Sequence, residues 1–222
     1  MISVFIATSG RTEMFRDMLQ SLRGTTQGWD LEVVAAIDAD MDAWKIAQEF
    51  QTRNWYKSRR RGALQAWNDA LTMTKGDILI PAGDDQIFHE GWLEYALESW
   101  KHKVNEYGVV GMNDLAYDGN TQVATMFLFD RNYCKDVMGG IFAPPAYRYY
   151  CVDSEWNEKA KMLGHFYWDE RSKVEHLHSA HNKRPVDDLD TEKQDAGWME
   201  HDNEIFRLRK EMGFPITWGS LI

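Results

Sequence analysis

The sequence predicts a single α/β domain in which helices flank a central, mostly parallel mixed sheet. Apolar segments of strand length alternate with amphipathic helical segments through the first 81 residues, as in proteins with parallel sheets. The chain has 222 residues, 44% of them hydrophobic, and no linker-like tract divides it. It is therefore long enough to bury one sizeable core.

The first elements follow a strand, helix, strand order. Residues 3–8 (SVFIAT) form a short apolar run that predicts a buried strand, and residues 12–22 predict an amphipathic helix. A second buried strand is predicted at residues 31–37 and ends at Asp38. The apolar face of the helix, which should pack on the sheet, consists of Phe15, Met18, Leu19 and Leu22.

The next unit begins at an acidic turn. Three aspartates within residues 38–42 favour a helix start, and this helix should continue to Phe50. A helix at residues 63–73 then leads into a strand at residues 77–81. The later elements are predicted as helices at 92–107, 131–138, 151–164 and 197–212, and as strands at 108–112, 123–129 and within 173–181.

Charge and cysteine content narrow the classes of protein. The 25 Lys and Arg residues against 35 Asp and Glu residues give a net charge of -10, which disfavours a nucleic-acid-binding surface. Cys134 and Cys151 form no CxxC pair, which argues against a zinc ribbon or disulfide framework and fits a reducing compartment. No signal peptide and no apolar run of membrane-spanning length is present, so we expect a soluble, cytoplasmic protein.

Polar residues follow the predicted strands at their carboxyl ends, where parallel sheets bind ligands. Residues 8–10 (TSG) follow the first strand, Asp38 ends the second, and Asp84 and Asp85 follow the third. Neither GxGxxG nor GxxxxGK[ST] occurs, so dinucleotide and P-loop sites lose support. Adjacent carboxylates suit a divalent cation with a nucleotide diphosphate, whereas ordinary turn and helix-cap chemistry is the alternative interpretation.

Three segments in this order resemble a known family. Residues 3–11 (SVFIATSGR), 31–38 (LEVVAAID) and 62–71 (GALQAWNDAL), which precede the strand that ends in Asp84 and Asp85, are similar to the nucleotide-binding half of family 2 glycosyltransferases with the GT-A fold. The resemblance covers about the first 90 residues and is weaker over residues 150–180. It implies a GT-A-like domain that binds a nucleotide-sugar donor.

The resemblance also implies roles for the acids. Asp38 would contact the base or ribose, Asp84 the ribose or a metal-bound water, and Asp85 the metal, for which Mn²⁺ or Mg²⁺ suits oxygen ligands. The sequence departs from a strict DXD motif, because Ala82 stands where the first Asp would fall. The other residues expected to bind the nucleotide sugar are Thr8, Ser9, Arg11, Arg61, Gly62 and Asn68. Arg61 lies in a run of three arginines that a solvated face would also explain.

Two acids open the predicted helix at residues 151–164. In the resembled family Asp153 would be the general base that takes the proton of an acceptor hydroxyl, and Glu155 would orient Asp153 or the acceptor. Attack from the side opposite the nucleotide would invert the anomeric centre. Helix capping by Asp and a favourable first-turn Glu are the alternative explanation of these two residues.

Two histidines follow in a segment that we interpret as a strand. Strict alternation would place His176 and His178 on one face, where two imidazoles can bind a metal. In related glycosyltransferases a His after the last core strand can complete the metal site. Hydrogen-bonded surface or core histidines are the alternative.

These inferences give one functional hypothesis and two alternatives. We expect a metal-dependent inverting glycosyltransferase, a hexosyltransferase, that moves a sugar from a nucleotide diphosphate donor, most simply a UDP sugar, to a hydroxyl acceptor. A metal-dependent phosphoesterase or nuclease and a catalytically silent nucleotide-sugar-binding protein are the alternatives. The acceptor can be a glycan, a lipid-linked or another hydroxyl, with a modified nucleic acid not excluded; the oligomeric state stays open.

The expected organisation is one domain with an extension. Residues 1–181 would form the GT-A-like domain, with residues 1–112 as the nucleotide-sugar-binding half and residues 113–181 as the acceptor and catalytic half. Residues 182–222 would form a helical extension packed on that domain. This extension is rich in acidic residues before its predicted helix.

Overall fold

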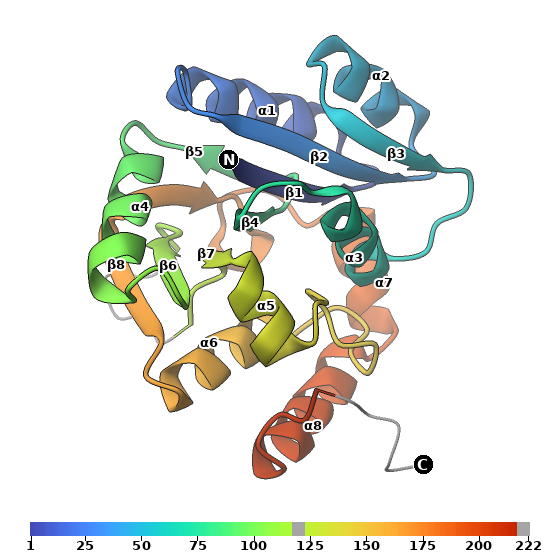
Figure 1. The fold of residues 1–222 in the computed structure, drawn as a ribbon. Helices are drawn as coiled ribbons and strands as arrows, with labels where there is room; N and C mark the ends of the chain where they lie inside the picture. Colours follow the sequence, from blue (N-terminus) through green and yellow to red (C-terminus); the bar gives the residue numbers. More distant parts are fainter. Residues whose placement is uncertain (117–122, 217–222) are drawn as a thin grey trace.

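One mixed sheet organises the molecule (Figure 1). The computed structural model describes residues 1–116 and 123–216, and within these residues eight strands pair in the order β3-β2-β1-β4-β7-β6-β8-β5. The pairs around β1 are parallel, whereas β7 runs antiparallel to both of its neighbours. The predicted fold class, an α/β domain with a mixed sheet, is confirmed.

The parallel half of the sheet brings three strand ends to one edge. Thr8 of β1 lies level with Ile37 of β2, and Ile6 of β1 lies level with Ala82 of β4. All seven residues of β1 are buried, as expected for an interior strand with helices on both faces. The strands here are β1 (Ile2–Thr8), β2 (Leu31–Asp38), β3 (Arg53–Lys57) and β4 (Ile78–Ala82), joined by α1 (Thr12–Thr25), α2 (Met41–Glu49) and α3 (Ala63–Met73).

The second half of the sheet carries the mixed pairing. β6 pairs antiparallel with β7 and parallel with β8, and the short β5 closes the edge beside β8. The strands are β5 (Gln86–Phe88), β6 (Val109–Asn113), β7 (Met126–Asp130) and β8 (Phe166–His176), and the helices are α4 (Trp92–Lys103), α5 (Arg131–Met138) and α6 (Val152–Met162).

Two apolar clusters lie on opposite faces of the sheet. One holds side chains of α1, α2 and α4, and in it the predicted face of α1, from Phe15 to Leu22, is fully buried. The other holds side chains of α3, α5 and α6 and is rich in aromatic residues. There Trp156 stacks on Phe129 with ring centroids 4.2 Å apart. These clusters fix the strands that carry the polar edge.

Two strands have no counterpart in the predicted elements. β3 (RNWYK) is an edge strand whose residues are half-buried or exposed, so its sequence lacks an apolar pattern. β5 has three residues, too few for periodicity to show. β8 ends at His176, so the expectation that His178 lies on the same strand is wrong; His178 instead caps a short 3-10 helix, η1 (Ser179–His181).

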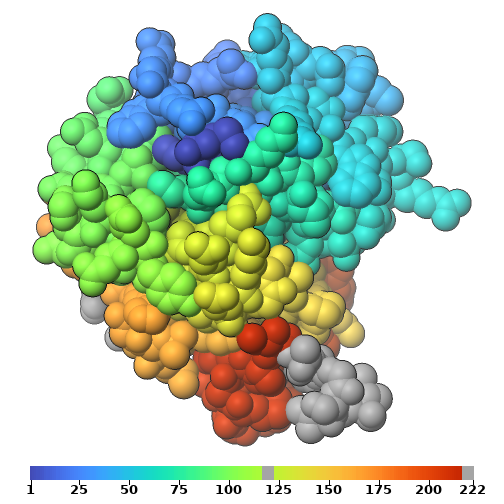
Figure 2. All heavy atoms as spheres, in the orientation of Figure 1, coloured from blue at the N-terminus to red at the C-terminus, as the bar shows by residue number. Residues whose placement is uncertain are grey.

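The chain continues as two helices after η1, α7 (Asp188–Asp195) and α8 (Trp198–Glu211), the second at the place of the predicted helix. In the space-filling view α8 is the red ridge beside the orange surface of α6 (Figure 2), and Lys210 pairs with Glu158 across that contact. The proposed division at residue 181 stays a prediction, and residues 117–122 and 217–222 of the two predicted parts lie outside the described residues. Among the described helices, none is long and apolar enough to cross a membrane.

Candidate functional site

A cavity of about 790 Å³ opens at the carboxyl edge of the parallel strands. Its walls come from the ends of β1, β2 and β4, the start of α6, the residues after β8, and α7 and α8. The structure therefore brings together most residues predicted from the sequence. Those that line the cavity are Thr8, Ser9, Arg11, Asp38, Arg61, Gly62, Asp84, Asp85, Asp153, His176 and His178.

The turn after β4 holds the acidic pair in a tight arrangement. Thr8 Oγ1 donates a hydrogen bond of 2.9 Å to Asp84 Oδ2, which links the ends of β1 and β4. The backbone N–H of Gly83 donates to Gln86 Oε1 at 3.0 Å. A Cβ added at Gly83 would lie only 2.8 Å from Asp85 Oδ1, so a residue without a side chain is needed for Asp85 to fold back over the turn.

The carboxylate of Asp38 is oriented by backbone groups. Its Oδ2 accepts hydrogen bonds from the N–H of Arg61 at 2.7 Å and of Gly62 at 2.9 Å, just before α3 begins. Ser9 Oγ donates to the carbonyl oxygen of Asp38 at 2.7 Å. Gly62 has a φ of 91°, a conformation that favours glycine. Because a carboxylate has about four acceptor positions, Asp38 keeps capacity for a ligand N–H or hydroxyl group.

Arg11 and His176 balance the charge of the acidic pair. Arg11 Nη1 lies 3.1 Å from Asp85 Oδ2 and 3.7 Å from Asp84 Oδ1, and His176 Nε2 lies 3.4 Å from Asp85 Oδ1. Burial, and then the charge of Asp85, raise the pKa of Asp84 to about 7. Against the effect of burial, His176 and Arg11 hold the pKa of Asp85 well below its usual range. Asp85 is therefore ionised near neutral pH, whereas Asp84 is partly protonated there.

The donor groups here fit a divalent metal that arrives with a phosphate ligand. Asp85 and His176 supply one oxygen and one nitrogen side by side, and the His176 and His178 ring centroids are 5.1 Å apart. His178 Nδ1 accepts from the N–H of Ala180 at 3.1 Å, so Nε2 is the ring nitrogen open to a ligand. Across the described part of the chain, no three acidic, His or Cys side chains form a preformed cage. Mg²⁺ commonly binds through one or two carboxylates plus substrate phosphates, which matches this set.

Asp153 lines the cavity from the first turn of α6. Its Oδ1 accepts the N–H of Ser154 at 2.8 Å. Burial raises the pKa of Asp153 because it disfavours the charged carboxylate, although the bond from Ser154 acts in the opposite direction. A carboxylate of raised pKa at a cavity wall has the properties of a general base.

Glu155 has a different place from the one expected. Its carboxylate is fully buried and accepts from Arg209 Nε at 2.6 Å and Nη2 at 2.7 Å, and from the Tyr147 hydroxyl at 2.7 Å. It lies on the helix side turned toward α8 and does not line the cavity. Glu155 therefore anchors α8 to α6 rather than orienting Asp153 or an acceptor. Residues two positions apart point to different sides of an α-helix, so Asp153 and Glu155 do not share a face.

Asn68 and the Arg61 side chain are also engaged by the protein. Asn68 Oδ1 accepts from the N–H groups of Phe142 and Ala143, both at 2.9 Å, and its Nδ2 donates to the Ala143 carbonyl at 2.8 Å. Asn68 thus fixes the loop after α5 and does not line the cavity. Arg61 contributes its backbone to Asp38, while its guanidinium pairs with Asp69 at 2.9 Å. A donor contact by Asn68 has no support in this arrangement.

Sequence reasoning missed Lys193, which α7 brings to the cavity next to Tyr149. Tyr149 and Lys193 line it, and Lys193 Nζ lies 3.7 Å from the centre of the Tyr149 ring. Burial, and then the charge of Arg11, lower the pKa of Lys193 to about 8. Asp202 of α8 positions this wall by accepting from the N–H groups of Arg148, Tyr149 and Tyr150. No local motif marks these residues, because their partners are more than 40 positions away in the sequence.

The family model of glycosyl transferase family 2 matches residues 3–156. No curated protein matches the chain. Among solved structures, the mannosyltransferase PcManGT from Pyrobaculum calidifontis, in complex with GDP-Man and Mn²⁺, has a TM-score of 0.66 at 18% identity over 79% of this chain and 56% of that chain. S. aureus TarS 1-349 in complex with UDP-GlcNAc has a TM-score of 0.61 at 14% identity over 78% of this chain and 57% of that chain. This chain thus spans less than two thirds of either structure, and the likeness confirms the GT-A-like fold.

Proposed function

We propose that this chain, which belongs to glycosyl transferase family 2, transfers a sugar from a nucleotide diphosphate donor to a hydroxyl acceptor with inversion of the anomeric centre. One observation carries the proposal. Asp38, the Asp84–Asp85 pair and Asp153 come from three separate segments, yet they line the same cavity of about 790 Å³. This volume lies in the range of small-molecule sites.

The strand ends supply the donor side of the cavity. Asp38, held by two backbone N–H groups, can accept a ring N–H of a base such as uracil or guanine. Asp84 follows β4, on the other side of β1, with a raised pKa, and hydrogen bonds to ribose hydroxyls suit a carboxyl group in either protonation state. We propose a UDP sugar as donor. S. aureus TarS 1-349 has been solved with UDP-GlcNAc, whereas PcManGT has been solved with GDP-Man, so both bases belong in a test.

Asp85, His176 and His178 are the residues that would hold Mn²⁺ or Mg²⁺. When bound, such an ion supplies positive charge that stabilises the departing nucleoside diphosphate. Arg11 reaches the same carboxylate from the N-cap position of α1 and is placed to add a guanidinium to the diphosphate. Before a metal binds, the protein keeps Asp85 ionised through His176 and Arg11 and fixes it over the glycine turn. To become a ligand, His176 would have to give up its proton and this contact with Asp85.

Asp153 is proposed as the general base. An acceptor hydroxyl bound at its wall of the cavity transfers its proton to a carboxylate oxygen of Asp153 as that hydroxyl oxygen attacks the anomeric carbon. The bond between that carbon and the diphosphate oxygen breaks on the opposite side, which gives inversion. Buried surroundings that raise the pKa of Asp153 make it a stronger base than an exposed aspartate.

The test measures release of nucleoside diphosphate from UDP, GDP and dTDP sugars, with and without Mn²⁺. We expect wild type to turn over one donor class, slowly by hydrolysis when no acceptor is supplied. Asp153→Asn should keep donor affinity and lose about 10²- to 10⁴-fold in rate. Glu158→Gln is the matched control, because Glu158 lies on the same helix and pairs with Lys210 at the surface.

Three outcomes would contradict this assignment. Full activity of Asp153→Asn would remove Asp153 from the role of base. Donor binding without any turnover in wild type would favour a nucleotide-sugar-binding protein. Hydrolysis of phosphodiesters with no binding of nucleotide sugars would favour a phosphoesterase.

A further inference from the structure

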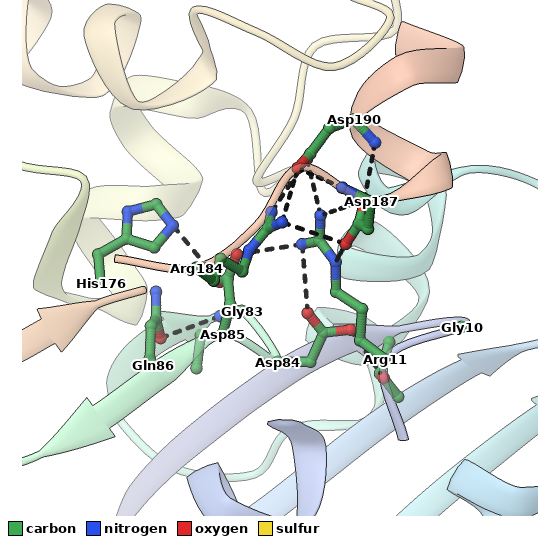
Figure 3. A network of polar contacts seen from close by, with 12 residues as sticks. Gly10, Arg11, Gly83, Asp84, Asp85, Gln86, His176, Arg184, Asp187 and Asp190 are labelled. Carbon is green, nitrogen blue, oxygen red and sulfur yellow. Dashed lines mark hydrogen bonds and ion pairs between the residues drawn. The ribbon is translucent and has the colours of Figure 1, made fainter. Parts of the chain in front are cut away.

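Two carboxylates at the start of α7, Asp187 at its N-cap and Asp190 in its first turn, hold two arginines next to the acidic pair (Figure 3). Arg11 Nε lies 2.8 Å from Asp187 Oδ2, and Arg11 Nη2 lies 2.9 Å from Asp190 Oδ1. Arg184 binds Asp190 with two nitrogens, at 2.6 and 3.0 Å, and its Nη1 lies 3.2 Å from Asp187 Oδ2. The same Arg11 guanidinium also contacts Asp85, so α7 is tied directly to the acidic pair.

Three of the four side chains in these contacts are shielded from solvent. The side chains of Arg11, Arg184 and Asp190 are 7%, 9% and 9% exposed, whereas that of Asp187 is 33% exposed. Nε of Arg184 is buried and has no hydrogen-bond partner within the described residues, so one donor of this guanidinium is unused. An unused buried donor costs free energy, which means that the carboxylates of α7 are not the best ligand set for Arg184.

The two carboxylates resemble the diphosphate of a nucleotide sugar in charge and chemistry. Against the effect of burial, hydrogen bonds from Arg11 and Arg184 hold the pKa values of Asp187 and Asp190 below the usual range, so both are ionised. Together they carry two negative charges, as the diphosphate of a nucleotide sugar does. Guanidinium groups bind carboxylates and phosphates with the same two-pronged geometry.

We propose that Asp187 and Asp190 form an internal latch, in which they occupy Arg11 and Arg184 in place of the donor's diphosphate until the donor displaces them. This inference rests on the proposed function, because it takes the ligand of the cavity to be a diphosphate. Arg184 thereby becomes a diphosphate-binding residue, and the segment 184–195 becomes the part that must move. The observed donor affinity is then the affinity of the open state multiplied by the fraction of molecules in which the latch is open.

Two further contacts hold α7 against the segments that we assign to the nucleotide. Glu192 of α7 pairs with Arg60 at 2.7 Å, beside the loop that holds Asp38. Leu189 lies next to Gly10, where an added Cβ would be 3.6 Å from its Cδ1. Helix α7 therefore contacts both segments that we assign to the nucleotide. When Asp187 and Asp190 release Arg11, these other contacts can still hold the rest of α7 in place.

The test measures binding of inorganic pyrophosphate, UDP and GDP, each with Mn²⁺, by titration calorimetry. The double variant Asp187→Asn/Asp190→Asn should bind pyrophosphate and the accepted nucleotide about tenfold more tightly than wild type, within the range of typical coupling between sites. Asn caps helices as well as Asp does, so α7 keeps its start in this variant. Asp188→Asn is the control, because Asp188 is exposed and this change removes one negative charge, half of that removed in the double variant, from the same turn.

A second readout separates a latch from a lid. Hydrogen exchange of the amides at residues 184–196 in wild type should become faster when the nucleotide and Mn²⁺ bind, because the latch is released. Slower exchange in this segment would overturn the proposal, since it would mean that α7 closes over the ligand. Unchanged affinity in the double variant, or equal gains in Asp188→Asn, would overturn it as well.

The outcomes also separate this proposal from the assignment of the donor. If UDP or GDP binds wild type and the double variant equally, the latch is wrong and the proposed function stands. If the double variant binds pyrophosphate more tightly while no protein binds UDP or GDP, the latch stands and the proposed donor is wrong. If none of the three ligands binds any variant, both are wrong.

Discussion

The two sides of the cavity are built in different ways. On the donor side, Thr8, Asp38 and Asp84 stand at the ends of paired parallel strands, and backbone register sets their positions. On the C-terminal side, α7 and α8 are held by ion pairs between residues more than 50 positions apart, such as Arg209 with Glu155. The first arrangement is rigid because the core fixes it, whereas the second depends on a few charged contacts that a ligand can compete for.

This difference has an energetic side. A buried ion pair contributes little net free energy relative to an apolar pair, but the loss of one partner leaves an uncompensated buried charge. Backbone N–H groups, in contrast, cannot be moved away from Asp38 without disturbing the start of α3. Loss of one partner of the buried ion pair that holds α8 should therefore change stability most, whereas loss of Asp38 should change ligand affinity most.

The largest effect is expected at the anchor of α8. Arg209→Met leaves the carboxylate of Glu155 buried without its guanidinium, which should lower the free energy of unfolding by about 3–5 kcal/mol. The measurement is urea-induced unfolding. Arg207→Met is the control on the same helix; the Arg207 side chain is 53% exposed, so its loss should change stability by about 0.5 kcal/mol or less. Equal stability of the two variants would contradict the role given to Glu155.

A smaller effect, on affinity rather than stability, is expected on the donor side. Asp38→Ala removes a charged acceptor from the proposed base site, so affinity for the accepted nucleotide should fall by about 10- to 100-fold, or about 1.5–3 kcal/mol. Asp42→Ala is the control, because Asp42 is exposed and pairs only with Lys45 at the surface in the contacts described. Calorimetric titration measures both. A loss of affinity in Asp42→Ala as large as in Asp38→Ala would show a general charge effect.

The smallest effect concerns pH. Asp84 binds its proton up to about pH 7 in the folded chain, whereas an unfolded aspartate releases it near pH 4, so this group lowers stability as pH rises between these values. Thr8 Oγ1 donates to Asp84 and opposes this shift. Thr8→Val should therefore cost about 1 kcal/mol at pH 8, where Asp84 is ionised, and less at pH 5.

Unfolding curves at both pH values measure this difference. Thr12→Val serves as the control, because Thr12 Oγ1 contacts Asp40 at 3.3 Å and does not reach the acidic pair. The same cost at pH 5 and pH 8 for Thr8→Val would show that the hydroxyl does not act through the charge of Asp84.

The same comparison explains how far sequence reasoning reached. The convergence of Asp38, Asp84 and Asp85 on one cavity was predictable because these acids follow apolar strands, and parallel strands must bring those ends together. The anchor role of Glu155 was not predictable, since the pattern of α6 does not show that Arg209 lies 54 residues further along. His178 was placed on a strand because alternation continues past His176, whereas the chain turns there into a 3-10 helix. Arg184 and Asp190 carried no motif beyond a helix cap.

The most direct measurement of the central claim is titration of UDP and GDP into wild type and Asp85→Asn, each with Mn²⁺ and with a chelator. The account predicts that wild type binds one of them at least tenfold more tightly with Mn²⁺, and that Asp85→Asn loses this gain while its unfolding curve stays close to that of wild type. Equal affinity with and without Mn²⁺ in both proteins would contradict the placement of a metal-bound diphosphate at the ends of the parallel strands.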